Sequence, residues 1–66
     1  MKICEANGKD NVPIYFDADK IICYYWNFNY RCIDVKLIGD VTIRVYENID
    51  TFSNQLTEIF YNKKEE

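Results

Sequence analysis

Residues 31–46 have the sequence RCIDVKLIGDVTIRVY, from Arg31 to Tyr46, and the fold depends on them more than on any other part of the chain. Apolar and polar residues alternate on both sides of Gly39-Asp40, which is typical of two half-buried antiparallel strands joined by a tight turn. A slip of one residue moves every side chain to the opposite face, so a two-residue turn would leave one apolar row in water. A three-residue turn, at 38–40 or at 39–41, places both rows on one face. Glycine and aspartate tolerate the positive φ that such a turn needs.

We therefore predict a hairpin with one apolar and one polar face. The apolar rows are Ile33, Val35 and Leu37 in the first strand and Val41, Ile43 and Val45 in the second. The outward face would carry a polar row suited to solvent or to a partner, made of Asp34, Lys36, Thr42, Arg44 and Tyr46.

Three further strands are expected before the hairpin. Residues 2–5 and 12–16 are predicted as short strands separated by a loop that begins with the strong turn signal Asn7-Gly8. Pro13 places the second of them at a sheet edge, or stands at its first position. Residues 20–28 are apolar or aromatic at nearly every position. This pattern indicates a strand that is central in the sheet or is covered by a second subunit.

After Tyr46 the apolar period changes from two to about 3.6, the period of an amphipathic helix. Asn48 is a favourable N-cap, and Asp50 complements the positive end of the helix dipole. The apolar stripe consists of Ile49, Phe52, Leu56, Ile59 and Phe60. We expect the helix to end near Asn62.

These elements predict a small α+β fold, in which an antiparallel sheet of four to five short strands is followed by one C-terminal amphipathic helix. The sheet would be a meander, with a barrel-like arrangement as an open alternative. Residues 1–62 would form a single small domain, and residues 63–66 a charged, solvated tail.

Composition restricts the class of function. The chain has 66 residues, a net charge of −3 and a pI near 4.8, which disfavours binding to a phosphate backbone. No apolar run approaches the length of about 18 residues that a membrane span needs, and the N-terminus lacks the apolar core of a signal peptide. We expect a cytoplasmic protein.

Catalytic and metal chemistry have little support, so we expect neither an enzyme nor a cofactor. The chain has no histidine, and its three cysteines, Cys4, Cys23 and Cys32, lack the C-x-x-C spacing of a zinc site. They are expected to be reduced, buried thiols. Asp17 and Asp19 lack the further ligands of a calcium loop, and we expect them to cap a turn or one short helical turn.

The aromatic content, 17%, is the unusual figure. Core packing is the simplest use of large rings in a short chain. Tyrosine and tryptophan are also enriched at binding hot spots, and we expect binding to another protein or self-association into a homo-oligomer. The predicted partner-binding residues are Tyr24, Trp26, Phe28, Tyr30, Arg44 and Tyr46.

Stacking of the same rings on single-stranded nucleic acid is a weaker alternative. It normally requires a positive groove, whereas this chain is acidic overall. The cations that would have to gather are Lys20, Arg31, Lys36 and Arg44.

Several motifs follow one another along the chain: Asn7-Gly8 after the first strand, Ile14-x-Phe16-x-x-Asp19-x-Ile21, Val35-x-Leu37-Ile38-Gly39-Asp40, Ile43-x-Val45-x-Glu47-Asn48, and a helix with Phe52, Leu56 and Ile59. This pattern resembles the FlbD-like (swarming-motility) small proteins encoded among bacterial flagellar genes. The chain differs from that family at Gly39-Asp40, where an Asn-Gly turn is usual, and at Asn48, where Ser or Thr is the usual cap. It also has Tyr24 to Tyr30 in place of an acidic, proline-containing stretch.

The resemblance implies the same topology and a role connected with motility. A small phage or mobile-element protein that binds and inhibits a host factor fits the same features.

Overall fold

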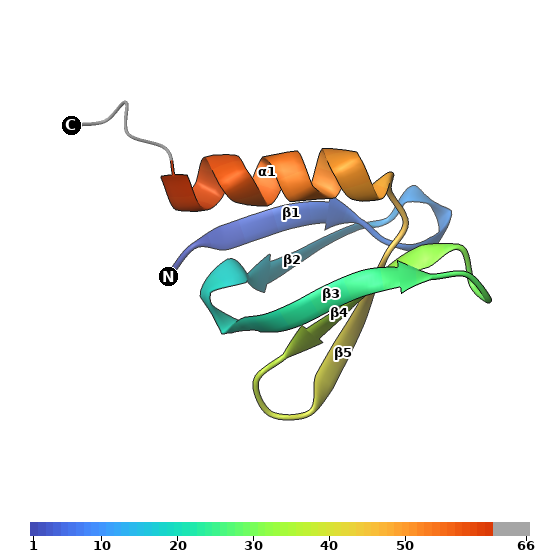
Figure 1. Cartoon of the computed structure of the whole chain (residues 1–66), viewed down its shortest axis with the longest axis horizontal. Coiled ribbons are helices and arrows are strands. Elements are labelled where there is room, and N and C mark those ends of the chain that lie inside the picture. The colour runs from blue at the N-terminus through green and yellow to red at the C-terminus, as the bar shows by residue number, and fades with distance from the viewer. Residues whose placement is uncertain (62–66) are drawn as a thin grey trace.

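A computed structural model describes residues 1–61, and Figure 1 shows how the elements follow one another. The strands are β1 (Ile3–Asn7), β2 (Pro13–Asp17), β3 (Ile21–Asn27), β4 (Cys32–Leu37) and β5 (Val41–Val45). Two short 3-10 helices, η1 (Lys9–Asn11) and η2 (Ala18–Lys20), flank β2, and the helix α1 (Ile49–Tyr61) comes last. The α+β fold with five strands and a C-terminal helix is therefore confirmed. The predicted helix end near Asn62 and the predicted tail at 63–66 lie outside the described residues.

The strands form two antiparallel sheets. One contains β1 and β2, and the other contains three strands in the order β3-β4-β5. The two sheets meet where β5 ends, because the Tyr46 N–H donates to the Asn7 carbonyl oxygen at 2.8 Å. The Asn7 N–H in turn donates to the Glu47 carboxylate, also at 2.8 Å. These bonds fix the end of the central hairpin against β1.

The hairpin of β4 and β5 has the three-residue turn at 38–40. Leu37 is paired with Val41 and Ile33 with Val45, so both apolar rows face the same side of the sheet, as predicted. Gly39 has a φ of +94° and Asp40 a φ of +61°, which are the positive values that the turn requires.

The core lies between the two sheets and α1. Phe52 of the helix is fully buried, with its ring edge-on to Tyr24 at 5.2 Å and 6.4 Å from the ring of Phe16. The cap predicted at Asn48 is confirmed, because its Oδ1 accepts the Asp50 N–H at 2.8 Å. Of the predicted apolar stripe, Phe52 and Leu56 are buried, Ile49 and Ile59 are half-buried against the core, and Phe60 is 40% exposed.

The short turn predicted around Asp17 is also present. Its Oδ1 accepts the Asp19 N–H at 3.0 Å and the Lys2 N–H at 3.2 Å. The two backbone donors, the Asp19 N–H first, lower the pKa of the Asp17 carboxyl. Pro13 stands at the first position of β2, where its missing N–H is tolerated.

Of the two alternatives for residues 20–28, the central position in the sheet is wrong, whereas cover by a second subunit stays a prediction. β3 lies at the edge of its sheet, and β4, which is buried at five of its six positions, is central. Ile22 is 65% exposed and Tyr25 is 45% exposed, so residues 1–61 of the same chain do not cover both faces of β3. The run of apolar residues was misleading because tyrosine is compatible with either environment.

Between residues 1 and 61, no helix is both long and apolar enough to cross a membrane.

The three cysteines are free thiols in different environments. Cys4 and Cys32 are buried, as predicted, whereas Cys23 is exposed, so the expectation of burial is wrong for that residue.

Candidate protein-binding surface

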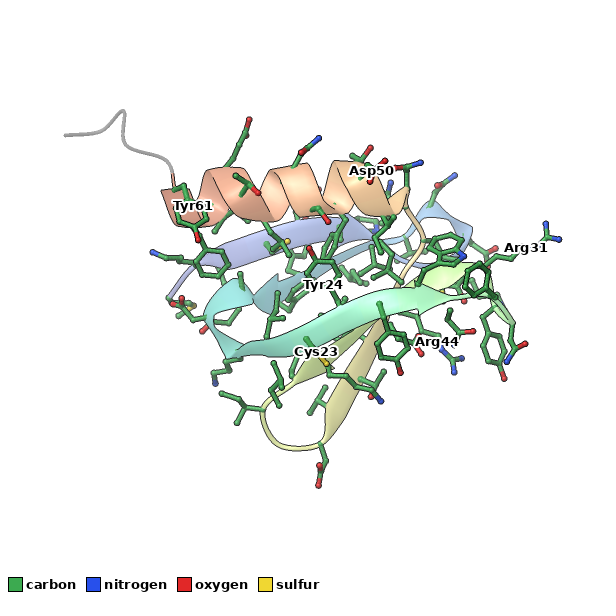
Figure 2. The ribbon with its side chains drawn as sticks, in the orientation of Figure 1. Cys23, Tyr24, Arg31, Arg44, Asp50 and Tyr61 are labelled. Carbon is green, nitrogen blue, oxygen red and sulfur yellow. The ribbon has the colours of Figure 1, made fainter. Side chains whose placement is uncertain are left out.

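The structure divides the predicted partner-binding residues between the two faces of the three-stranded sheet. Figure 2 shows Tyr24 on the side of β3 that faces the helix, and Arg44 on the opposite side. Because side chains alternate along a strand, Trp26 shares the inner face with Tyr24. Phe28 and Tyr30 belong to the turn between β3 and β4. Tyr46 follows β5 and is half-buried.

Tyr24 and Trp26 contribute to the core. Besides its contact with the Phe52 ring, Tyr24 has its hydroxyl 2.8 Å from the Ser53 hydroxyl. Trp26 is half-buried and packs against the core beside Ile49. Truncation of either ring is therefore expected to reduce the stability of the fold as well as any binding.

On the outer face of the sheet, Asp34 organises a polar cluster. Its carboxylate accepts a hydrogen bond from Asn27 Nδ2 at 3.0 Å and lies 3.5 Å from Arg44 Nε. The Asn27 side-chain oxygen also accepts the N–H groups of Asn29 and Tyr30, which folds the turn back over this face. Asp34 is only 6% exposed, so the expectation of a solvent-facing position is wrong for this residue. The side chain is buried because it is the acceptor that holds the turn.

Arg44 is held from two directions. Its guanidinium carbon lies 4.0 Å from the centre of the Tyr30 ring, and its Nε faces Asp34. The side chain remains about half exposed. A planar cation fixed by an aromatic face and a carboxylate loses less conformational entropy when it binds a ligand.

We call the following side chains the outer surface: Tyr25, Lys36 and Arg44 on the sheet, and Phe28, Tyr30 and Arg31 in the adjoining turn; all are exposed except Lys36, which is half-buried. Strand pairing places Tyr25 and Arg44 on either side of Asp34, in one row across the sheet. The predicted set omits Tyr25, Arg31 and Lys36. Tyr25 lies on the outer face because β3 pairs it with Asp34 of β4. The sequence could not predict this pairing, because residues 21–26 are apolar or aromatic throughout and do not alternate with polar residues.

The buried thiols are poor nucleophiles. Burial, followed by the charge of Glu47, raises the pKa of Cys4 to about 11. Burial, followed by the charge of Asp34, also raises the pKa of Cys32. A thiol with a raised pKa stays protonated near neutral pH. In residues 1–61, no three Cys, His, Asp or Glu side chains gather closely enough to hold a metal ion.

Comparison of the chain with models of known protein families, with curated proteins and with solved structures finds no match.

Proposed function

We propose that the chain is a non-enzymatic protein-interaction domain that binds an acidic segment of a partner protein through the outer surface. The observation that carries the proposal is the stack of Arg44 on Tyr30, anchored by Asp34. Arginine and tyrosine are enriched among the few residues that dominate binding free energies. Here both belong to a rigid sheet or to a turn that is hydrogen-bonded to it, so the surface needs little reorganisation.

The charges of the outer surface favour an acidic partner. Arg31, Lys36 and Arg44 are at least partly exposed, although the chain as a whole has a net charge of −3. The carboxylate among them, Asp34, is buried and already paired. Complementary charge speeds association and sets orientation, so a segment rich in aspartate and glutamate would be selected.

The proposal is non-enzymatic because the chain supplies few groups for proton transfer or nucleophilic attack. It contains no histidine, and the thiols of Cys4 and Cys32 have raised pKa values. The side chains of the outer surface can bind a partner but offer no such groups, so we propose binding without catalysis.

The partner's pathway belongs to the same proposal. The resemblance to FlbD-like proteins favours a cytoplasmic motility protein as the partner. Inhibition of a host factor by a phage or mobile-element protein is the alternative. Self-association into a homo-oligomer and binding of single-stranded nucleic acid are the competing outcomes.

Cross-linking from the outer surface tests the proposal. The full chain is produced in its own host cell with the photo-reactive p-benzoylphenylalanine in place of Phe28, which is 84% exposed. A matched chain carries the same group in place of Asn54, on an exposed helix position away from this surface. Mass spectrometry identifies the cross-linked segment in each case.

We expect position 28, and not position 54, to give a protein adduct on an acidic segment. Arg44→Ala should weaken binding about thirtyfold or more and reduce the yield accordingly, because hot-spot truncations cost about 2 kcal/mol or more. Equal adducts at both positions, indifference to Arg44→Ala, or an adduct with nucleic acid or a second copy would each overturn the proposal. A captured motility protein or a captured host regulator decides between the two pathways.

A further inference from the structure

The turn between β3 and β4, residues 28–31, carries the most exposed aromatic side chain in the described part of the chain. Phe28 is 84% exposed, and Figure 1 shows this turn projecting beyond the end of the sheet. Single exposed apolar side chains are common on protein surfaces, so exposure alone does not indicate a binding residue. Two further features distinguish this turn: its backbone is held in place, and it contains a strained arginine.

The Asn27 side chain holds the turn against the sheet. Its Oδ1 accepts the N–H groups of Asn29 and Tyr30, at 2.9 Å and 3.2 Å. Its Nδ2 donates to the buried Asp34 carboxylate at 3.0 Å. Phe28 therefore lies between residues that are hydrogen-bonded into the sheet. An apolar side chain presented on a fixed backbone loses less conformational entropy on binding than one on a mobile loop.

Arg31 ends the turn in the left-handed region of the backbone, with a φ of +54°. Apart from a glycine, the other residues at positive φ among residues 1–61 are Asp10, Asn11 and Asp40. Aspartate and asparagine tolerate this region better than most residues, whereas arginine does not, so Arg31 costs stability. Because strained backbone gathers at functional sites, its retention indicates a use for the arginine side chain.

The charge of Arg31 is available to a partner. The side chain is exposed, and Figure 2 shows it directed away from the rest of the molecule. Within residues 1–61, the ion pairs involve Arg44 and the Met1 ammonium, and not Arg31. A cation on the same turn as Phe28 favours a carboxylate beside the site that receives the phenylalanine.

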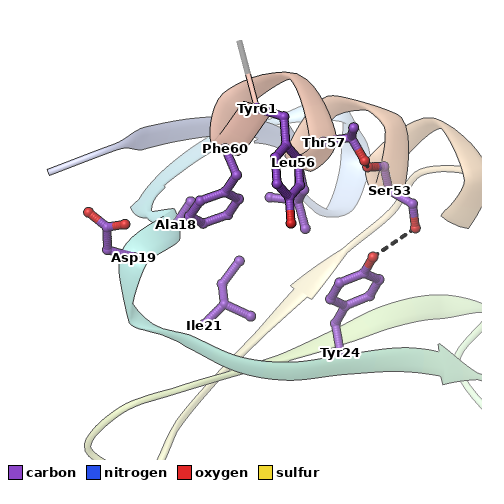
Figure 3. A pocket seen from close by; sticks show the side chains of 9 residues that line it. All are labelled: Ala18, Asp19, Ile21, Tyr24, Ser53, Leu56, Thr57, Phe60 and Tyr61. Atoms are coloured by element: carbon purple, nitrogen blue, oxygen red, sulfur yellow. Dashed lines mark hydrogen bonds between the residues drawn. The ribbon is translucent and has the colours of Figure 1, made fainter. Parts of the chain in front are cut away.

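The pocket between β3 and α1 has a different character. Figure 3 shows the Tyr24 and Ser53 hydroxyls joined across it, at 2.8 Å. Its volume is about 410 Å³, and the carboxylate that lines it, Asp19, lies 3.7 Å from the Met1 ammonium. These polar groups are thus already paired. Tyr24 is on the opposite face of the sheet from Arg44, so the pocket provides a control position for tests of the turn.

From these observations we infer that the turn enters the partner protein. Phe28 occupies an apolar pocket of the partner, and a carboxylate at the rim of that pocket pairs with Arg31. A projecting apolar side chain loses its contact with water on every side only in a concave site, and dominant binding residues typically fill such pockets. This inference rests on the proposed function, because it names the part of the acidic partner that the turn contacts.

Binding rates of the whole partner protein test the inference. The probe is the protein that the cross-link from position 28 identifies, and the target is the full chain held through a C-terminal biotin tag. In surface plasmon resonance, Phe28→Ala should bind about tenfold or more weakly, mainly through faster dissociation, because a buried anchor governs the dissociation rate. Phe28→Leu should lose less affinity, since leucine still fills an apolar pocket.

Two control variants locate the contact. Tyr15→Ala truncates another exposed aromatic ring, 63% exposed on β2, and should leave the affinity unchanged. Thr57→Arg places a long cation at the pocket of Figure 3 and should also leave it unchanged.

Arg31→Asn separates binding from folding. Asparagine tolerates the positive φ, so this variant should melt at or above the temperature of the wild type. It should nevertheless associate with the partner about threefold or more slowly at low salt, and its association rate should depend less on salt, because a charge at the rim acts mainly on association.

Several results would overturn the inference. If an acidic partner is captured but Phe28→Ala binds it as tightly as Tyr15→Ala does, the inference fails and the proposed function stands. Affinity lost with Thr57→Arg alone would assign binding to the pocket beside α1. A concentration-dependent oligomer that Phe28→Ala dissociates, detected by light scattering, would assign the turn to a second copy. A captured partner without carboxylates at the contact would overturn the proposed function, and this inference with it.

Discussion

Two phenylalanines in opposite environments provide a direct test of where the core lies. Phe52 is fully buried, whereas Phe28 is 84% exposed at the turn between β3 and β4. Truncation to alanine removes the same atoms at both positions. Any difference in stability therefore measures the surroundings and not the chemistry of the change.

The expected magnitudes are far apart. Phe52→Ala removes a ring that contacts Tyr24 and Phe16 and leaves a cavity, at a cost of about 3–5 kcal/mol. A domain of this length is stable by about 3–10 kcal/mol, so the variant should lose about a third or more of its free energy of unfolding at 25 °C. Phe28→Ala should change the free energy of unfolding by less than about 0.5 kcal/mol.

Thermal unfolding followed by circular dichroism measures both variants. With about 4–8 °C of melting temperature per kcal/mol, Phe52→Ala should melt at least about 12 °C below the wild type, and Phe28→Ala within about 4 °C of it. Similar losses in the two variants, or a loss below about 1 kcal/mol for Phe52→Ala, would refute the assignment of the core.

Three further predictions concern a thiol, a carboxylate and a turn. Because the pKa of Cys4 is raised from 9.0 to about 11, the wild type should lose about 2–3 kcal/mol of stability as the pH rises from 9 to 11. Cys4→Ala should lack this loss, and parallel alkaline urea curves for the two chains would contradict it. Because the pKa of the Asp17 carboxyl is lowered, mainly by the Asp19 N–H, its stabilisation is present above pH 4 and is lost as the pH falls through the folded-state pKa. Asp17→Asn should therefore be less stable than the wild type at pH 6, with the gap closing toward pH 2 in urea titrations; a gap independent of pH would argue against this bond. Gly39→Ala should cost about 1–2 kcal/mol in urea unfolding, because φ is +94° there and the added methyl group would meet no atom within 4 Å, so only backbone strain contributes. The control Asp40→Asn, at the next position, should change the free energy of unfolding by less than about 0.5 kcal/mol. If the two variants lost the same stability, the positive φ of Gly39 would not be the cause.

Local features of the fold were predictable from the sequence. The turn at 38–40, the Asn48 cap and the helical turn after Asp17 each depend on residues a few positions apart, and their side-chain chemistry determines the structure. The three-residue length of the turn between β4 and β5 was equally accessible, because a two-residue turn would leave one apolar row in water. The sequence left two registers open, with the turn at 38–40 or at 39–41, and the structure has the first.

The arrangement of the sheets was not predictable in the same way. It depends on contacts between distant parts of the chain, such as the bond from the Tyr46 N–H to the Asn7 carbonyl oxygen and the hydrogen bond between the Tyr24 and Ser53 hydroxyls. The candidate site was affected for the same reason. Tyr24 and Tyr25 are chemically identical neighbours, and only their pairing with β4 assigns one to the core and the other to the outer surface.

We propose that Arg44, held on Tyr30 by Asp34, dominates binding to an acidic partner. The measurement that tests it most directly is calorimetric titration of the cross-linked partner segment, as a synthetic peptide, into the wild type and into Arg44→Lys. Lysine keeps the charge but not the planar guanidinium that stacks and faces the carboxylate, so the affinity should fall about tenfold, or 1.4 kcal/mol. Equal affinity of the two chains would contradict the claim, because charge alone would then account for the binding.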